Sequence, residues 1–193
     1  GRDPSKPGVV LMSHQDVVPV EPGTEANWEQ EPFSGALAGG FVWGRGTMDT
    51  KSKLVALCEA VERLLRDGFQ PTRTIHLVFG HDEEVGGRDG ALVIAKRWEA
   101  DGTRFDWVLD EGGTIAVGIV PGVAAPVALI GIAEKGYMTL SLTASAEGGH
   151  SSMPPPHTSI GILATAIERV EGNPLPAALR GASRHFFAAV APE

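Results

Sequence analysis

Three short apolar runs, separated by stretches with helical periodicity, constrain the fold of this chain more than any other feature. The runs span residues 8–13, 74–79 and 107–109, and continuous apolar runs of this length are typical of strands buried on both faces. Amphipathic helices are expected over residues 51–66 and about 88–98, between successive runs. This alternation predicts an α/β fold in which a parallel-rich sheet is wrapped by helices.

The helix expected over residues 51–66 carries apolar residues at spacings of three and four. We expect Asp49 or Thr50 to cap its N-terminus, because short polar side chains can accept hydrogen bonds from the first free backbone N–H groups. Cys58, the only cysteine of the chain, lies on the apolar face of this helix. It cannot form an internal disulfide, and we interpret it as a core residue.

Acidic residues and one histidine follow the three apolar runs, at the points where the strands should end. In open α/β sheets, ligands bind beyond the carboxyl ends of the strands. Adjacent acids in a single turn are usually a solvated loop, but their recurrence after several strands favours a functional site. One further acid reaches this region from the loop before a helix. The residues concerned are His14, Asp16, Asp49, Glu83, Glu84, Asp110 and Glu111.

This set of side chains indicates a metal site, because imidazole and carboxylate ligands without thiolates suit a hard or borderline divalent cation. One histidine among several acids favours two ions, and a carboxylate that bridges two zinc ions about 3.5–4 Å apart would hold a hydroxide for attack on an amide carbonyl. Neighbours in the pair Glu83-Glu84 leave the backbone in different directions, so one can ligate while the other acts as general base. Asp16, two residues after His14, can accept the proton of the second imidazole nitrogen and fix its tautomer.

Outside this alternation the sequence changes character. Residues 19–46, rich in Gly and Pro, predict a loop and a hairpin. We expect their aromatic residues to pack, with stacking of Trp28 or Trp43 on a ligand as the less favoured alternative. Residues 114–132 predict short strands, and residues 136–144 alternate polar and apolar side chains as a half-exposed antiparallel strand does. A rigid Gly/Pro turn and a second amphipathic helix are expected over residues 148–156 and 159–170.

Composition narrows the class of ligand. The net charge of −8 and the lack of a basic cluster argue against nucleic acid or an anionic membrane as a partner. No apolar run is long enough to span a bilayer, and no secretory signal is present. Small molecules or peptides remain as ligands. The compartment is left open, with the cytoplasm favoured, because the chain opens on Gly1 directly ahead of a strand and its natural N-terminus is expected to be missing.

Five motifs in order give the sequence a resemblance to the aminoacylase and carboxypeptidase family of di-zinc metallopeptidases. Within that family it is most similar to the branch of carboxypeptidase S-like enzymes and N-acyl-amino-acid hydrolases. The resemblance implies zinc-dependent hydrolysis of an amide bond, in a peptide or N-acyl amino acid, next to a free carboxylate. The motifs are Ser-His-Gln-Asp-Val-Val-Pro-Val at 13–20, Gly-Arg-Gly-Thr-Met-Asp-Thr-Lys at 44–51, Asp-Glu-Glu-Val-Gly-Gly at 82–87, Leu-Asp-Glu-Gly-Gly at 109–113 and Gly-His-Ser-Ser-Met-Pro at 149–154.

Residue by residue, the resemblance implies His14 as a ligand of one zinc ion, Asp49 as the bridge between two ions and Glu84 as a ligand of the other. It implies Glu83 as the general base and Asp16 as the acid that orients the histidine. Cobalt or manganese are alternatives to zinc.

The last acidic ligand is either Asp110 or Glu111, and Asp110 is favoured because it continues the Asp-Glu-Gly-Gly pattern of the branch. The family also implies a ferredoxin-like α+β lid inserted into the catalytic domain. We therefore expect a zinc-peptidase-like catalytic domain over residues 1–133 and the start of the lid over residues 134–193. His150 matches the lid histidine that reaches a substrate carbonyl oxygen, and such lids commonly form a homodimer contact.

The family pattern calls for one more histidine ligand after the lid, and this sequence has no match for it. His185 lies in the expected lid without the Gly-rich context of that ligand, and the sequence stops at Pro192-Glu193. We therefore expect an interior fragment of a longer enzyme, catalytically silent by itself. The alternative is a non-catalytic metal-binding or dimerisation module descended from such an enzyme. Retention of Glu83 favours the enzyme, since a binding module needs no general base.

Overall fold

The computed structural model describes residues 1–134 and 136–191 and separates the chain into two compact units, Gly1–Gly112 and Gly113–Glu193. The first unit holds the parallel sheet and its helices. Pro192-Glu193, the end of the lid domain expected from the sequence, lies outside the described residues. The domain boundary expected after residue 133 stays a prediction.

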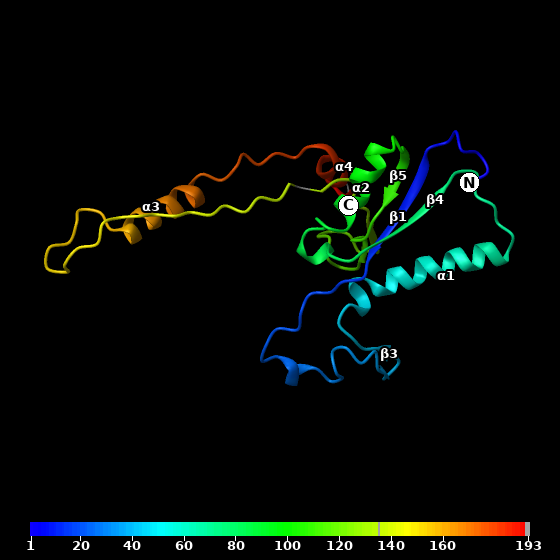
Figure 1. Ribbon diagram of the computed structural model, residues 1–193, viewed down its shortest axis with the longest axis horizontal. Coiled ribbons are helices and arrows are strands. Elements are labelled where there is room, and N and C mark those ends of the chain that lie inside the picture. The colour runs from blue at the N-terminus through cyan, green and yellow to red at the C-terminus, as the bar shows by residue number, and fades with distance from the viewer. Residues whose placement is uncertain (135, 192–193) are drawn as a thin grey trace. The chain divides into compact units, whose positions relative to one another are not determined.

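The sheet of the first unit consists of three parallel strands in the order β4-β1-β5 (Figure 1). β1 (Gly8–His14) lies at the centre and pairs with β4 (Ile75–Gly80) and β5 (Phe105–Leu109). Val10, which pairs with Val108 of β5, is fully buried. The three apolar runs therefore form the three strands that they predict.

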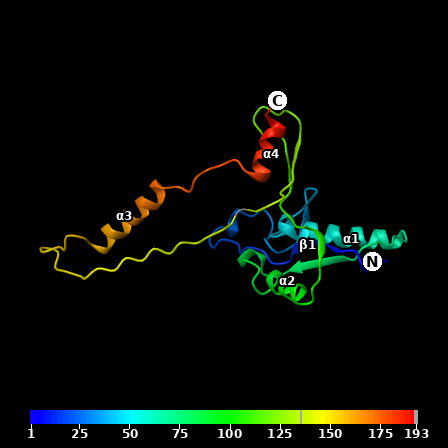
Figure 2. The same ribbon diagram turned by 90° about the horizontal axis from the view of Figure 1, so that it is seen from above.

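Helices flank this sheet, as the alternation of the sequence predicts. α1 (Ser52–Arg66) and α2 (Ala91–Ala100) lie on opposite sides of β1 (Figure 2). The ring of Trp98 in α2 meets the rings of Phe105 and His76 edge to face, with centroids 4.6 and 5.4 Å apart. Aromatic pairs in this geometry stabilise beyond the area they bury, so this cluster fixes α2 against the sheet.

The N-terminus of α1 differs from the prediction. A wide turn, η2 (Thr47–Lys51), precedes the helix, and Asp49 and Thr50 have non-helical backbone angles within it. Lys51 occupies the N-cap position and makes no side-chain cap hydrogen bond. The prediction that Asp49 or Thr50 caps this helix is therefore wrong. The physical reason is a tertiary contact, because the Asp49 carboxylate is directed at the imidazole of His14 instead.

The prediction that Cys58 is a core residue is also wrong, because this cysteine is exposed on α1. Leu54 and Val61 of the same helix are half-buried, whereas Val55 and Leu65 are 55% and 66% exposed. The packing of α1 in the described structure thus uses only part of the apolar face that periodicity identifies.

Most of the shorter elements agree with those predicted from the sequence. β2 (Leu37–Ala38) and β3 (Phe41–Val42) form the predicted hairpin. In the second unit, β6 (Thr114–Ala116) and β7 (Val127–Leu129) pair antiparallel, and α3 (Ser159–Gly172) is the predicted second amphipathic helix. The sequence does not predict the helical segments η1 (Glu25–Asn27) and α4 (Gly181–Val190).

The strand predicted over residues 136–144 is wrong for the structure as described. Alternation gives a segment one apolar face, but a strand also needs a neighbour that supplies N–H and C=O partners, and no described strand pairs with this segment. The turn predicted over residues 148–156 is present, with the Met153 N–H donating to the His150 carbonyl at 2.8 Å. None of the helices in the described ranges has the length and apolar character to cross a membrane.

A Val10→Ala substitution should lower the free energy of unfolding by about 2 kcal/mol, because it removes buried methyl groups and leaves a cavity in the central strand. Val108→Ala is the matched control, since this register partner is 53% exposed and should cost less than about 1 kcal/mol. Urea unfolding of both variants measures the difference. Equal losses would contradict the central position of β1.

Candidate metal centre

Three parallel strands bring their carboxyl ends to one edge of the sheet in the first unit. His14 is the last residue of β1, and β4 leads into the short helix η3 (Glu83–Val85). Asp110 and Glu111 directly follow β5. Asp49 approaches the same edge from the turn η2, in front of α1. Chemistry-bearing residues that are far apart in sequence thus gather at the place where open α/β sheets bind ligands.

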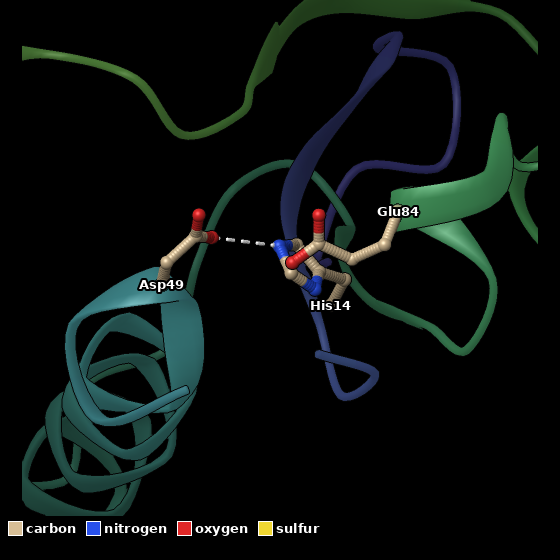
Figure 3. A group of neighbouring side chains, drawn as sticks. All are labelled: His14, Asp49 and Glu84. Atoms are coloured by element: carbon tan, nitrogen blue, oxygen red, sulfur yellow. Dashed lines mark hydrogen bonds and ion pairs between the residues drawn. The ribbon is translucent and has the colours of Figure 1, made fainter. Parts of the chain in front are cut away.

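His14 is the hub of this group. Only 2% of its surface is exposed, and its Nε2 lies 3.1 Å from Asp49 Oδ1 and 3.1 Å from Glu111 Oε1. A third carboxylate oxygen, Glu83 Oε2, lies 3.7 Å from the same nitrogen. Figure 3 shows the side chains of His14, Asp49 and Glu84 converging from three different elements. One imidazole nitrogen therefore faces several carboxylates at once.

Two groups of side chains could hold a metal ion, and both include His14. One consists of His14, Asp49 and Glu84, and the other of His14, Glu83 and Glu111, with the potential ligand atoms of each group within 4.8 Å of one another. Nitrogen and carboxylate oxygen donors suit zinc and other borderline or hard divalent cations. A cation would also offset the repulsion among the clustered carboxylates, so the donor set fits a metal centre.

The second imidazole nitrogen of His14 is held by Asp16, through its main chain. Nδ1 lies 2.9 Å from the Asp16 carbonyl oxygen and 3.4 Å from a carboxylate oxygen of the same residue. A carbonyl oxygen can only accept, so Nδ1 carries a proton. Nε2 donates to the carboxylates when the ring is doubly protonated, and it offers its lone pair to a metal ion when the ring is neutral. The Asp16 carboxylate instead accepts the backbone N–H of Glu84 at 3.0 Å, and its other oxygen is buried without a hydrogen-bond partner among the described residues.

The environment shifts the pKa values of these groups in different directions. Burial raises the pKa of Glu83, and the neighbouring carboxylates act in the same direction. Burial acts against the charged form of His14, but the Asp16 carbonyl and the surrounding acids raise its pKa above the ordinary value. Burial likewise opposes the Asp16 carboxylate, yet hydrogen bonds from backbone N–H groups hold its pKa below the usual range. The shift at Glu83 favours uptake of a proton by this carboxylate.

The structure distinguishes between the members of the pair after β5. Glu111 reaches His14, whereas an oxygen of Asp110 accepts the backbone N–H of Glu111 at 2.9 Å and belongs to neither ligand group. The geometry therefore favours Glu111, although the sequence pattern favours Asp110. His150 lies in the second unit, exposed, with its Nδ1 bound to Ser152.

Two lysines near the centre were missed by the sequence analysis. Lys51 donates to the carbonyl oxygen of Gln15, which ties η2 to the end of β1. The ammonium of Lys53 is buried without a hydrogen-bond partner in the described structure. Burial lowers the pKa of Lys53, while the charges of Asp110 and Glu111 act the other way. A lysine at the start of an amphipathic helix usually points to solvent, so no sequence signal identified either contact.

Comparison with known proteins gives a family match over almost the whole chain. The model of peptidase family M20/M25/M40 matches residues 10–190. An N-fatty-acyl-amino acid synthase/hydrolase PM20D1 from Xenopus tropicalis is 44% identical over 167 residues, which cover 86% of this chain and 32% of that protein.

Carboxypeptidases are among the similar proteins as well. A probable carboxypeptidase S-like 2 from Dictyostelium discoideum is 43% identical over 93% of this chain and 35% of its own length. Carboxypeptidase S from Saccharomyces cerevisiae is 44% identical over 90% of this chain and 30% of its own length. The chain therefore spans about a third of the length of the curated relatives it matches.

Zinc should raise the midpoint of thermal unfolding of this chain, because a ligand of the folded state stabilises it by about 2.7 kcal/mol at 100 times its Kd. His14→Ala should remove most of that rise, since His14 belongs to both ligand groups. His81→Ala is the matched control, because this exposed histidine follows β4 and belongs to neither group. Calorimetric scans with and without zinc test this, and a loss of equal size in both variants would contradict the assignment.

Proposed function

The chain belongs to peptidase family M20/M25/M40, and from this premise we propose that its protein is a metal-dependent amidohydrolase. Its substrate is a peptide or an N-acyl amino acid that is cleaved at the amide bond next to a free carboxylate. The observation that carries the proposal is that two sets of potential metal ligands, each made of the His14 imidazole and two carboxylates, meet at the sheet edge. Relatives named as an N-fatty-acyl-amino acid synthase/hydrolase and as carboxypeptidase S support the substrate class.

The proposed centre holds two zinc ions, with cobalt or manganese as alternatives. His14 and one member of the pair Asp110-Glu111 would hold one ion, Glu84 the other, and Asp49 would bridge them. When bound, the metal would supply Lewis acidity that lowers the pKa of a water molecule and polarises the amide carbonyl. The distances from His14 Nε2 to Asp49 and Glu111 support this assignment and make Glu111 the better candidate of the pair.

Glu83 is the proposed general base. Its carboxylate would take the proton of the attacking water and deliver it to the nitrogen of the departing amino group. The raised pKa of Glu83 supports this role, because a general base is more effective when its pKa lies closer to the working pH. Asp16 would act indirectly, since its carbonyl fixes the His14 tautomer and its carboxylate fixes the backbone of Glu84.

Residues 134–193 are proposed as part of a lid that contributes His150 to the reaction and mediates a homodimer. The backbone N–H of Ser152 donates to His150 Nδ1 at 3.2 Å, so the neutral ring carries its proton on Nε2. That tautomer supports a role as hydrogen-bond donor to the oxyanion that forms from the amide carbonyl. A purely metal-binding or dimerisation module would have no use for Glu83 and is the disfavoured alternative.

Glu83→Gln in the full-length protein should abolish turnover of N-acyl amino acids and dipeptides while leaving about two zinc ions per active site. Removal of a general base typically costs 10²–10⁴-fold in rate. Glu84→Gln is the matched comparison, since it changes the neighbouring carboxylate and should lose metal. Zinc analysis and a rate assay together separate the role of general base from that of metal ligand. Equal zinc loss in both variants would contradict the assignment of Glu83 as the base.

His150→Ala should lower kcat by roughly 10²–10³-fold through loss of one oxyanion donor, with zinc content unchanged. His157→Ala is the control, because it removes an exposed histidine from the same loop. If the donor acts across a homodimer, mixing His150→Ala with Glu83→Gln subunits should restore part of the activity. A kcat equal to that of His157→Ala would show that His150 is a surface residue without a role in the reaction.

A further inference from the structure

Asp49 differs from the other candidate ligands because no strand leads directly to it. It lies in the turn η2, where its backbone angles are non-helical. Its carboxylate oxygen lies 3.1 Å from His14 Nε2, the contact drawn as a dashed line in Figure 3. Among the described residues, His14 is the one hydrogen-bond partner of this carboxylate. The position of the Asp49 side chain therefore depends on how the backbone of η2 is held.

The segment that leaves β1 contacts η2 through every second residue. This exit segment comprises residues 13–17. The Ser13 hydroxyl donates to the Thr50 carbonyl at 3.3 Å, and both residues are buried. The Lys51 ammonium, at the last position of η2, donates to the Gln15 carbonyl. Both hydrogen bonds end on main-chain carbonyl groups, so they fix the backbone of the turn against the backbone of the exit segment.

Gly46, which precedes η2, makes the third contact. Its φ is +82°, in the left-handed region that glycine adopts readily. A Cβ atom at this position would overlap Cγ1 of Val17 and lie 3.4 Å from the Asp49 carbonyl oxygen. The Gly46 carbonyl accepts the backbone N–H of Lys51 at 2.9 Å, which closes the turn. The glycine thus lets η2 approach the exit segment closely.

The Lys51 contact is the one among these three that a side chain of η2 makes. Its acceptor is fixed by the sheet, because the Gln15 N–H donates to the Gly80 carbonyl at the end of β4 at 2.8 Å. Hydrogen bonds from an ammonium group are stronger than those between neutral groups. Lys51 therefore ties the turn that carries Asp49 to the paired strands.

We propose that Lys51 is a positioning residue of the metal centre, which holds η2 so that Asp49 can bind metal together with His14. The inference rests on the proposed function, which makes Asp49 a ligand of both ions. Ligand atoms must lie within about 0.2 Å of their preferred distance from a metal ion. A small displacement of η2 from the exit segment therefore weakens metal binding, although Lys51 is not itself a ligand.

The test measures zinc binding to metal-free full-length protein by isothermal titration calorimetry. Lys51→Met should raise the zinc Kd at least about tenfold, the effect typical of losing a group that orients a ligand. Lys51→Arg should restore most of the affinity, because a guanidinium can donate to the same carbonyl. Lys96→Met is the matched control, since it removes the same charge from α2, which contributes to neither ligand group. The metal-free Lys51→Met and Lys96→Met proteins should unfold at the same temperature.

A zinc Kd that is equal in Lys51→Met and Lys96→Met would overturn the proposal. A lower unfolding temperature of metal-free Lys51→Met with unchanged zinc affinity would overturn it in favour of a purely structural role. Gly46→Ala keeps the test available if Lys51→Met does not fold. It should weaken zinc binding, and Val17→Ala added to it should recover part of the affinity by removing the methyl groups that the new Cβ would meet.

Unchanged zinc binding in Gly46→Ala would likewise overturn the proposal. The proposed function fails separately, if the wild-type protein binds zinc with this dependence on Lys51 but hydrolyses neither N-acyl amino acids nor dipeptides.

Discussion

Parallel pairing of β1 with β4 and β5 is the interaction on which the candidate centre depends. Parallel strands end at the same edge, so a buried sheet converts three separated stretches of sequence into one constellation. The register matters as well as the direction, because His14 pairs with Gly80 and this places the imidazole beside the turn that carries Glu83. Val9 and Val10, on opposite faces of β1, are both buried, so the central strand is covered on both faces.

The electrostatics of the centre impose a second constraint. A buried imidazole surrounded by carboxylates is compatible with folding only where their repulsion is offset, by protons, by hydrogen bonds or by a cation. In the described structure, backbone N–H groups bind the Asp16 carboxylate, and burial together with the neighbouring carboxylates raises the pKa of Glu83. The buried ammonium of Lys53 adds positive charge close to Asp110 and Glu111. The remaining excess of negative charge accords with a centre built for divalent cations.

The sequence predicts the strands and the flanking helices, because these depend on periodicity. It also predicts that several acids lie near His14, because parallel strands share a direction, while the roles of the individual residues stay predictions. It fails where a tertiary contact competes with a local preference. Asp49 has the chemistry of a helix cap, yet its contact with His14 removes it from that role. Cys58 has the right periodicity for the core, but no local rule says how much of a helical face is covered. The sequence predicts that the Asp16 carboxylate orients His14, whereas the Asp16 atom nearest to Nδ1 is its carbonyl oxygen, a contact that the residue type cannot reveal.

The segment from Phe41 to Lys51 joins the exposed hairpin to a candidate metal ligand. Its last part positions Asp49 through η2 and through the contact of Lys51 with Gln15. The position of Asp49 is constrained by the geometry around His14, whereas exposed residues such as Phe41 and Met48 carry little of the packing. Substitutions at these exposed positions should therefore leave the residues around His14 in place.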